Sequence, residues 1–175
     1  MIDLASQRLI LIPLSPEALA ALIAQDRAAA ERAVGGAFPP GALVPPLMAD
    51  ALDFFLKLAE SSPDWGGRVY LTRETREVAG LGGFTGPPGP DGVVTMGYSV
   101  FPAHQRRGYA SEAARALADW ALAQPGVTVV QATIVDGNIA SERVAAYAGL
   151  IRTDDIEDDP DEGPVVVWRR ARDEA

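Results

Sequence analysis

The hydrophobic pattern of this chain changes between the period of strands and the period of helices. Apolar runs rich in β-branched residues predict strands at residues 8–13, 68–72, 78–85, 93–101, 127–135, 151–156 and 165–170. Segments with apolar residues three and four positions apart predict helices at residues 15–25, 47–60, 111–123 and 139–148. We therefore expect an α/β (α+β) fold in which helices flank one sheet.

Local signals support these boundaries. Ser15 and Pro16 suit the start of the first helix, while Gly126 and Gly149 suit the ends of the last two. Residues 35–46 are rich in glycine and proline and predict a flexible connection. The nearly continuous apolar run at residues 127–135 predicts a strand buried on both faces. Because no repeat or change in composition divides the chain, residues 1–175 are predicted to form one domain.

Composition narrows the classes of function. The chain has no cysteine and one histidine, so we expect no disulfide, no thiolate nucleophile and no metal site. A net charge of −9 argues against nucleic-acid binding, which requires a basic surface. The longest apolar stretch near the start, residues 9–14, is too short for a membrane span and lacks the layout of a secretion signal. We therefore expect a cytoplasmic protein with no membrane partner.

One short segment carries the candidate chemistry. Residues 105–110, QRRGYA, lie between a predicted strand and a predicted helix. A turn with free backbone N–H groups at a helix N-terminus binds anions, and two arginines in an acidic chain favour a phosphate-rich ligand. The alternative is that Gly108 only ends an element and that the arginines are solvated. Other phosphate signatures fail, since the glycines at residues 80–86 do not fit a dinucleotide fingerprint and no P-loop occurs.

The order of strand, Q-x-x-G-x-A turn, helix, buried strand, short helix, glycine and two strands resembles the Gcn5-related N-acetyltransferases (GNAT). The segments at residues 97–100, 105–113, 138–144 and 149–150 are similar to its ribosomal-protein-alanine acetyltransferase branch, the RimJ/RimL-like proteins. The resemblance covers most of the chain. It implies a single GNAT domain with a mixed, mostly antiparallel sheet whose central strands splay apart. It also implies acetyl-coenzyme A as co-substrate, with no metal.

The resemblance further implies which residues hold the co-substrate. Backbone N–H groups of the turn would bind the pyrophosphate, and the strand edge near Val100 would bind the pantetheine amides and polarise the thioester carbonyl. Asn138 would orient co-substrate or acceptor, although asparagine at a helix start is also a common N-cap, and Arg143 would contact phosphate or solvent. The expected cofactor-binding residues are Val100, Gln105, Arg106, Arg107, Gly108, Tyr109, Ala110, Ser111, Asn138 and Arg143.

The leaving group needs a proton donor. In many relatives a tyrosine four residues before the equivalent of Gly149 protonates the coenzyme A thiolate, but here that position is Ala145. Tyr147 lies two residues further on and is expected to face another direction. The branch that this chain resembles has a serine three residues after the asparagine, so the role passes to Ser141, with helix capping as the alternative. Ser141 and Asn138 are therefore the candidate catalytic residues.

The sequence does not identify a general base. Relatives often carry a glutamate where this chain has Thr95. His104 has a suitable pKa, but it adjoins the turn, where a surface or cofactor contact is the alternative. A deprotonated lysine at neutral pH costs roughly 4–5 kcal/mol and a deprotonated α-amine only about 1 kcal/mol. A site with a weak base therefore favours an α-amine, or a small amine of similarly low pKa.

Residues 154–162 contain seven carboxylates in nine positions between the last two predicted strands. They predict a solvated acidic hairpin loop, and in the fold implied by the resemblance this connection flanks the acceptor entrance, where it could attract a basic peptide end. Trp65, Trp120 and Trp168 are expected in or beside the core.

The expected activity is direct transfer of acetyl from acetyl-coenzyme A to a primary amine, either a peptide N-terminus or a small molecule. No covalent enzyme intermediate is expected, because the chain has no cysteine and shows no Ser–His pairing. The alternatives are a sensor or interaction module that binds acyl-coenzyme A without chemistry, and an unrelated α/β binding domain. A homodimer is compatible with the resemblance.

Overall fold

The computed structural model describes residues 2–173, in which eight strands form one sheet with the order β1-β2-β3-β4-β5-β6-β8-β7. The strands are β1 (Leu4–Ala5), β2 (Leu9–Pro13), β3 (Gly67–Thr72), β4 (Val78–Phe84), β5 (Val93–Val100), β6 (Val129–Val135), β7 (Ile151–Asp159) and β8 (Gly163–Ala171). Adjacent strands are antiparallel, except that β5 and β6 are parallel. The structure confirms the mixed, mostly antiparallel sheet.

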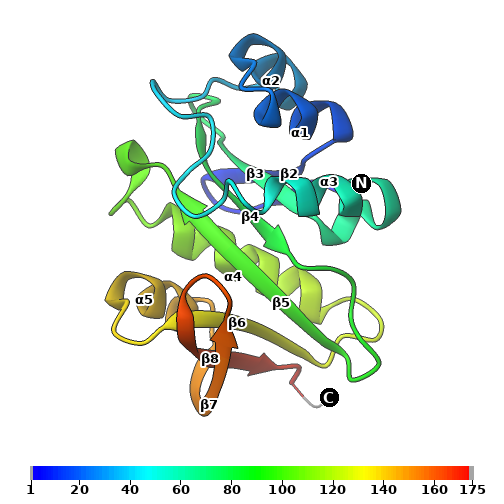
Figure 1. Ribbon diagram of the computed structural model, residues 1–175, viewed down its shortest axis with the longest axis vertical. Helices are drawn as coiled ribbons and strands as arrows, with labels where there is room; N and C mark the ends of the chain where they lie inside the picture. The colour runs from blue at the N-terminus through cyan, green and yellow to red at the C-terminus, as the bar shows by residue number, and fades with distance from the viewer. Residues whose placement is uncertain (1, 174–175) are drawn as a thin grey trace.

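Helices cover the two faces of the sheet unequally. They are α1 (Pro16–Ile23), α2 (Arg27–Val34), α3 (Leu52–Ser61), α4 (Tyr109–Leu122) and α5 (Ile139–Tyr147), with short 3₁₀ helices η1 (Pro63–Trp65) and η2 (Pro102–His104). One hydrophobic core lies between the sheet and α4, and a second joins α1, α2 and α3 to β3 and β4. In Figure 1, α4 lies behind β5, whose front is not covered by a helix. One face of the sheet is therefore open along β5 and β6.

The splay between β5 and β6 creates the feature that matters for function. Pairing runs from Val93 and Val129 to Thr95 and Gln131, whereas β5 continues to Val100 and β6 continues for four residues beyond Gln131. Within the described residues, the two strands do not pair beyond this point. The edge of β5 that would face β6 is therefore free to bond a ligand, as the predicted splay requires.

Three glycines of β4 explain the glycine-rich stretch that the dinucleotide fingerprint did not fit. A Cβ atom at Gly80 would lie 2.2 Å from the Ser99 carbonyl oxygen, and one at Gly82 would lie 2.1 Å from the Tyr70 hydroxyl. Gly83 is equally crowded by the Gly66 carbonyl oxygen, at 2.2 Å. These glycines let β4 pack closely against its neighbours and serve no phosphate loop.

The structure corrects several predicted boundaries. Helix α2 was not predicted, although Asp26 caps it by accepting a hydrogen bond from the Ala29 N–H and Gly35 ends it with φ 67°. Helix α3 begins at residue 52 instead of 47. Leu47 has φ 65°, a left-handed conformation that does not occur inside a right-handed helix, so the helix cannot include this residue. Strand β6 alternates buried and half-buried residues, so only one of its faces is fully buried. That face lies beneath α4, and its other face belongs to the open side of the sheet.

The acidic segment was predicted as a loop, but most of it forms strand. Residues 154–159 belong to β7, and the hairpin turn comprises only residues 160–162. Strand β7 is mostly exposed, and it lies at the edge of the sheet, so its carboxylates can stay solvated while the backbone pairs with β8. The tryptophans pack as expected. Trp168 belongs to the core beneath α4, and Trp65 and Trp120 are partly buried and pack against this core.

Candidate functional site

A pocket of about 470 Å³ opens where β5 and β6 separate. Its wall is formed by the free end of β5, the turn before α4, the start of α5 and two residues of the loop before α3. The lining residues are Pro46, Leu47, Tyr98, Ser99, Val100, His104, Gln105, Arg106, Gly108, Tyr109, Ala110, Ser111, Asn138, Ala140, Ser141, Arg143 and Val144. Every predicted site residue except Arg107 therefore lines one pocket.

The turn before α4 has the backbone shape of an anion site. Arg106 has φ 59° and Gly108 has φ 79°, both left-handed. Alternation of left- and right-handed residues turns successive N–H groups toward one side. Helices α1, α2 and α5 are capped by side chains, whereas Gly108 offers none to α4. The first N–H groups of a 14-residue helix are thus left for a ligand.

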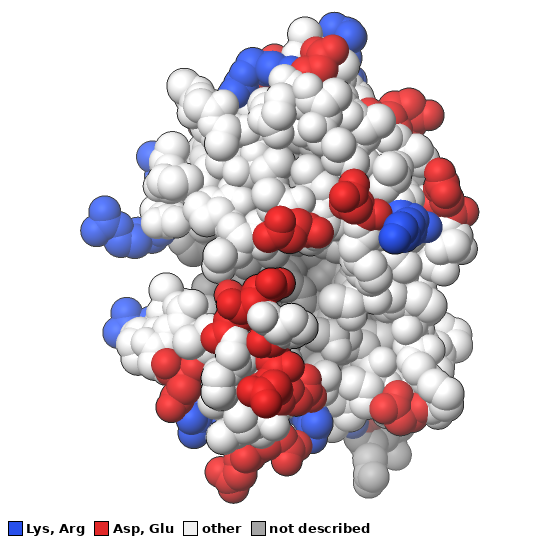
Figure 2. Space-filling model, viewed as in Figure 1, with Lys and Arg blue, Asp and Glu red and all other residues white. Residues whose placement is uncertain are grey.

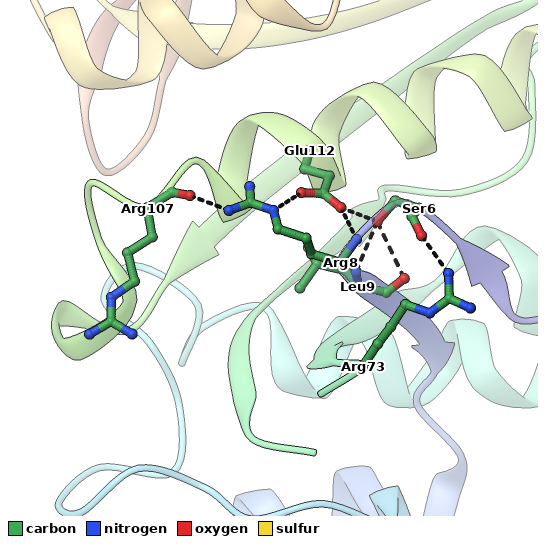
Figure 3. A network of polar contacts seen from close by, with 6 residues as sticks. All are labelled: Ser6, Arg8, Leu9, Arg73, Arg107 and Glu112. Atoms are coloured by element: carbon green, nitrogen blue, oxygen red, sulfur yellow. Dashed lines mark hydrogen bonds and ion pairs between the residues drawn. The ribbon is translucent and has the colours of Figure 1, made fainter. Parts of the chain in front are cut away.

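Arg8 holds this turn from the N-terminal part of the chain (Figure 3). Its Nη1 donates a hydrogen bond to the Arg107 carbonyl oxygen at 2.8 Å, and its Nε forms an ion pair with Glu112 Oε2 at 2.7 Å. The guanidinium carbon also lies 4.8 Å from the centre of the Tyr109 ring. Arg8 does not line the pocket, so it acts on the turn from outside. In Figure 3 the Arg107 side chain points away from this network.

Glu112 ties the first turn of α4 to the segment between β1 and β2. Its Oε1 accepts hydrogen bonds from Ser6 Oγ at 2.7 Å and from the Arg8 backbone N–H at 2.6 Å. Burial alone would raise the pKa of Glu112, but the hydrogen bonds from Ser6 and Arg8 outweigh burial and lower the pKa. The carboxylate therefore stays charged at neutral pH. Sequence analysis missed both Arg8 and Glu112, whose contacts span 104 residues.

The two candidate catalytic residues lie at the start of α5. Asn138 Oδ1 accepts a hydrogen bond from the Ser141 backbone N–H at 3.2 Å, so Asn138 is the N-cap of the helix and also lines the pocket. Ser141 Oγ lies 3.3 Å from the Tyr98 hydroxyl, to which it donates, and the Tyr98 hydroxyl donates to the Ser141 carbonyl oxygen at 3.0 Å. Burial raises the pKa of Tyr98, although the hydrogen bond from Ser141 opposes this. Tyr98 was not predicted as part of the site.

Of the other candidate groups, His104 lines the same pocket and Tyr147 lies outside it. Tyr147 is exposed and lines a different hollow beside α4, as its helical spacing predicted, and Ala145 is fully buried. His104 is only 5% exposed, so it is not a surface residue, and burial lowers its pKa. Its Nδ1 is buried and has no hydrogen-bond partner within residues 2–173. Thr95 accepts a hydrogen bond from Gln131 Nε2 at 3.2 Å.

The open face of the sheet is hollowed and acidic. Figure 2 shows a hollow between the half that carries α3 and the half that carries the β7–β8 hairpin, with Asp and Glu gathered over the hairpin. Asp159 accepts hydrogen bonds from the Asp161 and Glu162 backbone N–H groups at 2.9 and 3.0 Å, which lower its pKa. Asp159 thus stabilises the turn, while the neighbouring carboxylates are exposed to solvent.

Two further properties concern the described part of the chain. Among residues 2–173, no helix combines the length and the apolar character that crossing a membrane requires. The same residues contain no group of three or more His, Asp or Glu side chains placed to hold a metal ion.

Comparison with known proteins identifies the family. A family model described as "Acetyltransferase (GNAT) domain" matches residues 8–151. An uncharacterized N-acetyltransferase, YjdG of Bacillus subtilis, is 30% identical over 83 residues; the match spans 47% of this chain and 49% of that protein. The chain thus matches about half the length of this curated relative.

Solved structures share the fold. An acetyltransferase from Agrobacterium tumefaciens is 26% identical, with a TM-score of 0.65 and coverage of 97% of this chain and 94% of that one. The ribosomal-protein-S5-alanine acetyltransferase of Vibrio fischeri has a TM-score of 0.69 at 14% identity, with 99% and 98% covered. An aminoglycoside acetyltransferase solved with coenzyme A has a TM-score of 0.61 at 20% identity, with 93% and 94% covered. Since the family model covers most of this chain, the protein belongs to the GNAT acetyltransferase family.

Proposed function

We propose that this protein transfers acetyl from acetyl-coenzyme A directly to a primary amine. The observation that carries the proposal is the uncapped N-terminus of α4 beside a left-handed turn, which opens into the pocket at the splay. Such a turn binds the pyrophosphate of coenzyme A through backbone N–H groups, and the Arg106 side chain adds positive charge. The free edge of β5 at Val100 then offers backbone groups to the pantetheine arm. This assigns the turn to the co-substrate.

Ser141 is the proposed donor of a hydrogen bond to the departing thiolate. Its hydroxyl lines the pocket and is held 3.3 Å from Tyr98, a long hydrogen bond that the hydroxyl can exchange for one to sulfur. Tyr98 would then keep the serine oriented through the Ser141 carbonyl oxygen. Asn138 supports the same turn as the helix N-cap. The pair of hydroxyls replaces the tyrosine found at the position of Ala145 in many relatives.

The acceptor is proposed to be an amine of low pKa, such as a peptide N-terminal α-amine or a small amine. The described residues that line the pocket include no carboxylate, and burial lowers the pKa of His104, so the pocket offers no strong base. An α-amine loses its proton at neutral pH at a cost of only about 1 kcal/mol, so it needs less help from a base than a lysine amine does. The acidic hairpin beside the hollow favours a cationic molecule on this side of the sheet. A RimJ/RimL-like role toward a protein N-terminus in the cytoplasm agrees with these features.

Release of free thiol tests this function. The purified protein is incubated with acetyl-coenzyme A and a panel of amines and short peptides, and the thiol is followed over time. Thiol release that requires an amine, with acetylated amine found by mass spectrometry, supports direct transfer. Tight binding of acetyl-coenzyme A with no amine-dependent release would instead support the sensor or interaction module, which the missing carboxylate at Thr95 favours.

A further inference from the structure

A row of polar side chains crosses the open face of the sheet where β5 and β6 begin to separate. Thr95 on β5 pairs with Gln131 on β6, which pairs with Arg169 on β8. The residues on either side of Thr95 and Gln131 in the chain belong to the core beneath α4, so these two side chains lie on the opposite face. Asp155 on β7 completes the row through an ion pair with Arg169. Four strands thus contribute to one polar line.

The chemistry of this row fixes the direction of each hydrogen bond. Arg169 Nη1 lies 2.5 Å from Asp155 Oδ2, and its Nε donates to Gln131 Oε1 at 3.2 Å. Because arginine only donates, the amide oxygen of Gln131 must face it, and the amide Nε2 donates to Thr95 Oγ1 at 3.2 Å. The Thr95 oxygen is therefore an acceptor in this row. Its hydroxyl hydrogen has no acceptor within residues 2–173, so the Thr95 O–H remains available as a donor to a ligand.

This donor lies on an open path to the pocket. Thr95, Gly97 and Ser99 share one face of β5, and Ser99 lines the pocket. A Cβ atom at Gly97 would meet only Met48 Cε within 4 Å, at 3.8 Å, and Thr95 is half-buried. The face of β5 is therefore uncrowded between Thr95 and Ser99. At ~3.3 Å per residue these positions are ~13 Å apart, so three extended peptide residues of ~10 Å together with one hydrogen bond of ~3 Å can span them.

We propose that Thr95 binds the acceptor by donating a hydrogen bond to a backbone carbonyl of a peptide, at about the third residue counted from the reactive α-amine. Gln131 and Arg169 are positioning residues, which hold the Thr95 hydroxyl as a donor. This inference rests on the proposed function, since it takes the open face as the side from which the amine reaches the thioester. It selects peptides with a free N-terminus over amines that lack a carbonyl group.

The test compares two acceptors on variants of Thr95. Trialanine amide offers backbone carbonyls, whereas propargylamine is a weakly basic amine without one. Thr95→Val keeps the shape and removes the donor, and Thr95→Ser restores it. Thr95→Val should lower kcat/KM for the peptide ~10-fold, mainly through KM, and change the value for propargylamine less than about 2-fold. Thr95→Ser should stay within about 2-fold of the wild type for both.

Equal losses for both acceptors, or no loss for the peptide, would overturn the inference. A second measurement separates it from the proposed function: calorimetric titration of trialanine amide into protein saturated with coenzyme A. Weaker binding by Thr95→Val than by wild type, with no thiol release by either, would contradict the transferase activity and support the peptide contact. Equal binding by the two proteins, or no binding by the wild type, would contradict the peptide contact even if transfer occurs.

Discussion

Replacement of Arg8 by alanine should weaken coenzyme A binding although Arg8 does not line the pocket. The change removes the hydrogen bond to the Arg107 carbonyl oxygen, the ion pair to Glu112 and the contact with Tyr109. The Arg8 backbone N–H still bonds to Glu112, so the segment keeps its anchor to α4. The main expected consequence of the substitution is therefore a less ordered turn before α4.

The size of the effect follows from exposure. The Arg8 side chain is 46% exposed and that of Glu112 is 13% exposed, so the ion pair is partly screened by solvent and contributes at most about 1 kcal/mol. The hydrogen bond from a charged donor to the Arg107 carbonyl oxygen adds roughly 1 kcal/mol. In the variant, the binding of coenzyme A must supply most of this free energy to order the turn. A loss of about 1.4 kcal/mol in binding free energy raises the Kd for coenzyme A ~10-fold.

Calorimetric titration with coenzyme A measures this change, and Arg73 provides a matched control. Arg73 Nη1 donates to the Ser6 carbonyl oxygen at 2.9 Å, so it holds the same N-terminal segment without touching the turn (Figure 3). Arg73→Ala should leave the Kd within about 2-fold of the wild type, and both Arg73→Ala and Arg8→Ala should lower Tm by a few degrees. An unchanged Kd for Arg8→Ala, or an equal rise for Arg73→Ala, would refute the reasoning.

Three further outcomes are expected. Ser141→Ala should lower kcat ~10-fold or more with little change in coenzyme A affinity, whereas the exposed Tyr147→Phe should be silent; the reverse in a thiol-release assay would make the tyrosine the proton donor. Changing Asp158 and Asp161 to Asn should raise KM for a basic peptide several-fold at low salt with almost no change in Tm, and an equal KM would remove the hairpin from recognition. Since burial lowers the pKa of His104 below its usual value of about 6.5, the unfolded chain takes up its proton first as pH falls. Stability should fall between pH 7 and pH 5, and less so in His104→Phe; equal slopes of Tm against pH would contradict this.

Most of the order of elements could be predicted because most helices and strands have a clear hydrophobic period and are bounded by glycine, proline or capping residues. Boundaries failed where the backbone conformation has no strong sequence signal. Leu47 adopts φ 65°, which a leucine seldom does, so the start of α3 appeared five residues early. The signals for α2 were present at Asp26 and Gly35, but its alanine-rich sequence has only a narrow apolar stripe. The acidic part of β7 was not predicted as a strand because carboxylates are rare in strands.

The site could be predicted where its residues are neighbours in the chain and not where the fold brings them together. The turn at residues 105–111 and the start of α5 are local motifs, and the structure places both in one pocket. The contact of Arg8 with Glu112 spans 104 residues and that of Tyr98 with Ser141 spans 43, so neither leaves a local signal. Arg107 was included for its charge, but the structure uses its carbonyl oxygen.

The central claim is that the N-terminus of α4 binds the phosphates of acetyl-coenzyme A, and Ala110→Glu tests it most directly. Ala110 lines the pocket in the first turn of α4, where a carboxylate stabilises the helix dipole and so preserves the fold. The same carboxylate repels a bound pyrophosphate, and Ala110→Gln adds equal bulk without charge. Calorimetric titration with acetyl-coenzyme A should show binding weakened by ~30-fold or more in Ala110→Glu and by much less in Ala110→Gln, with Tm unchanged or raised. Equal affinity of Ala110→Glu and the wild type would contradict the claim that this turn is the phosphate site.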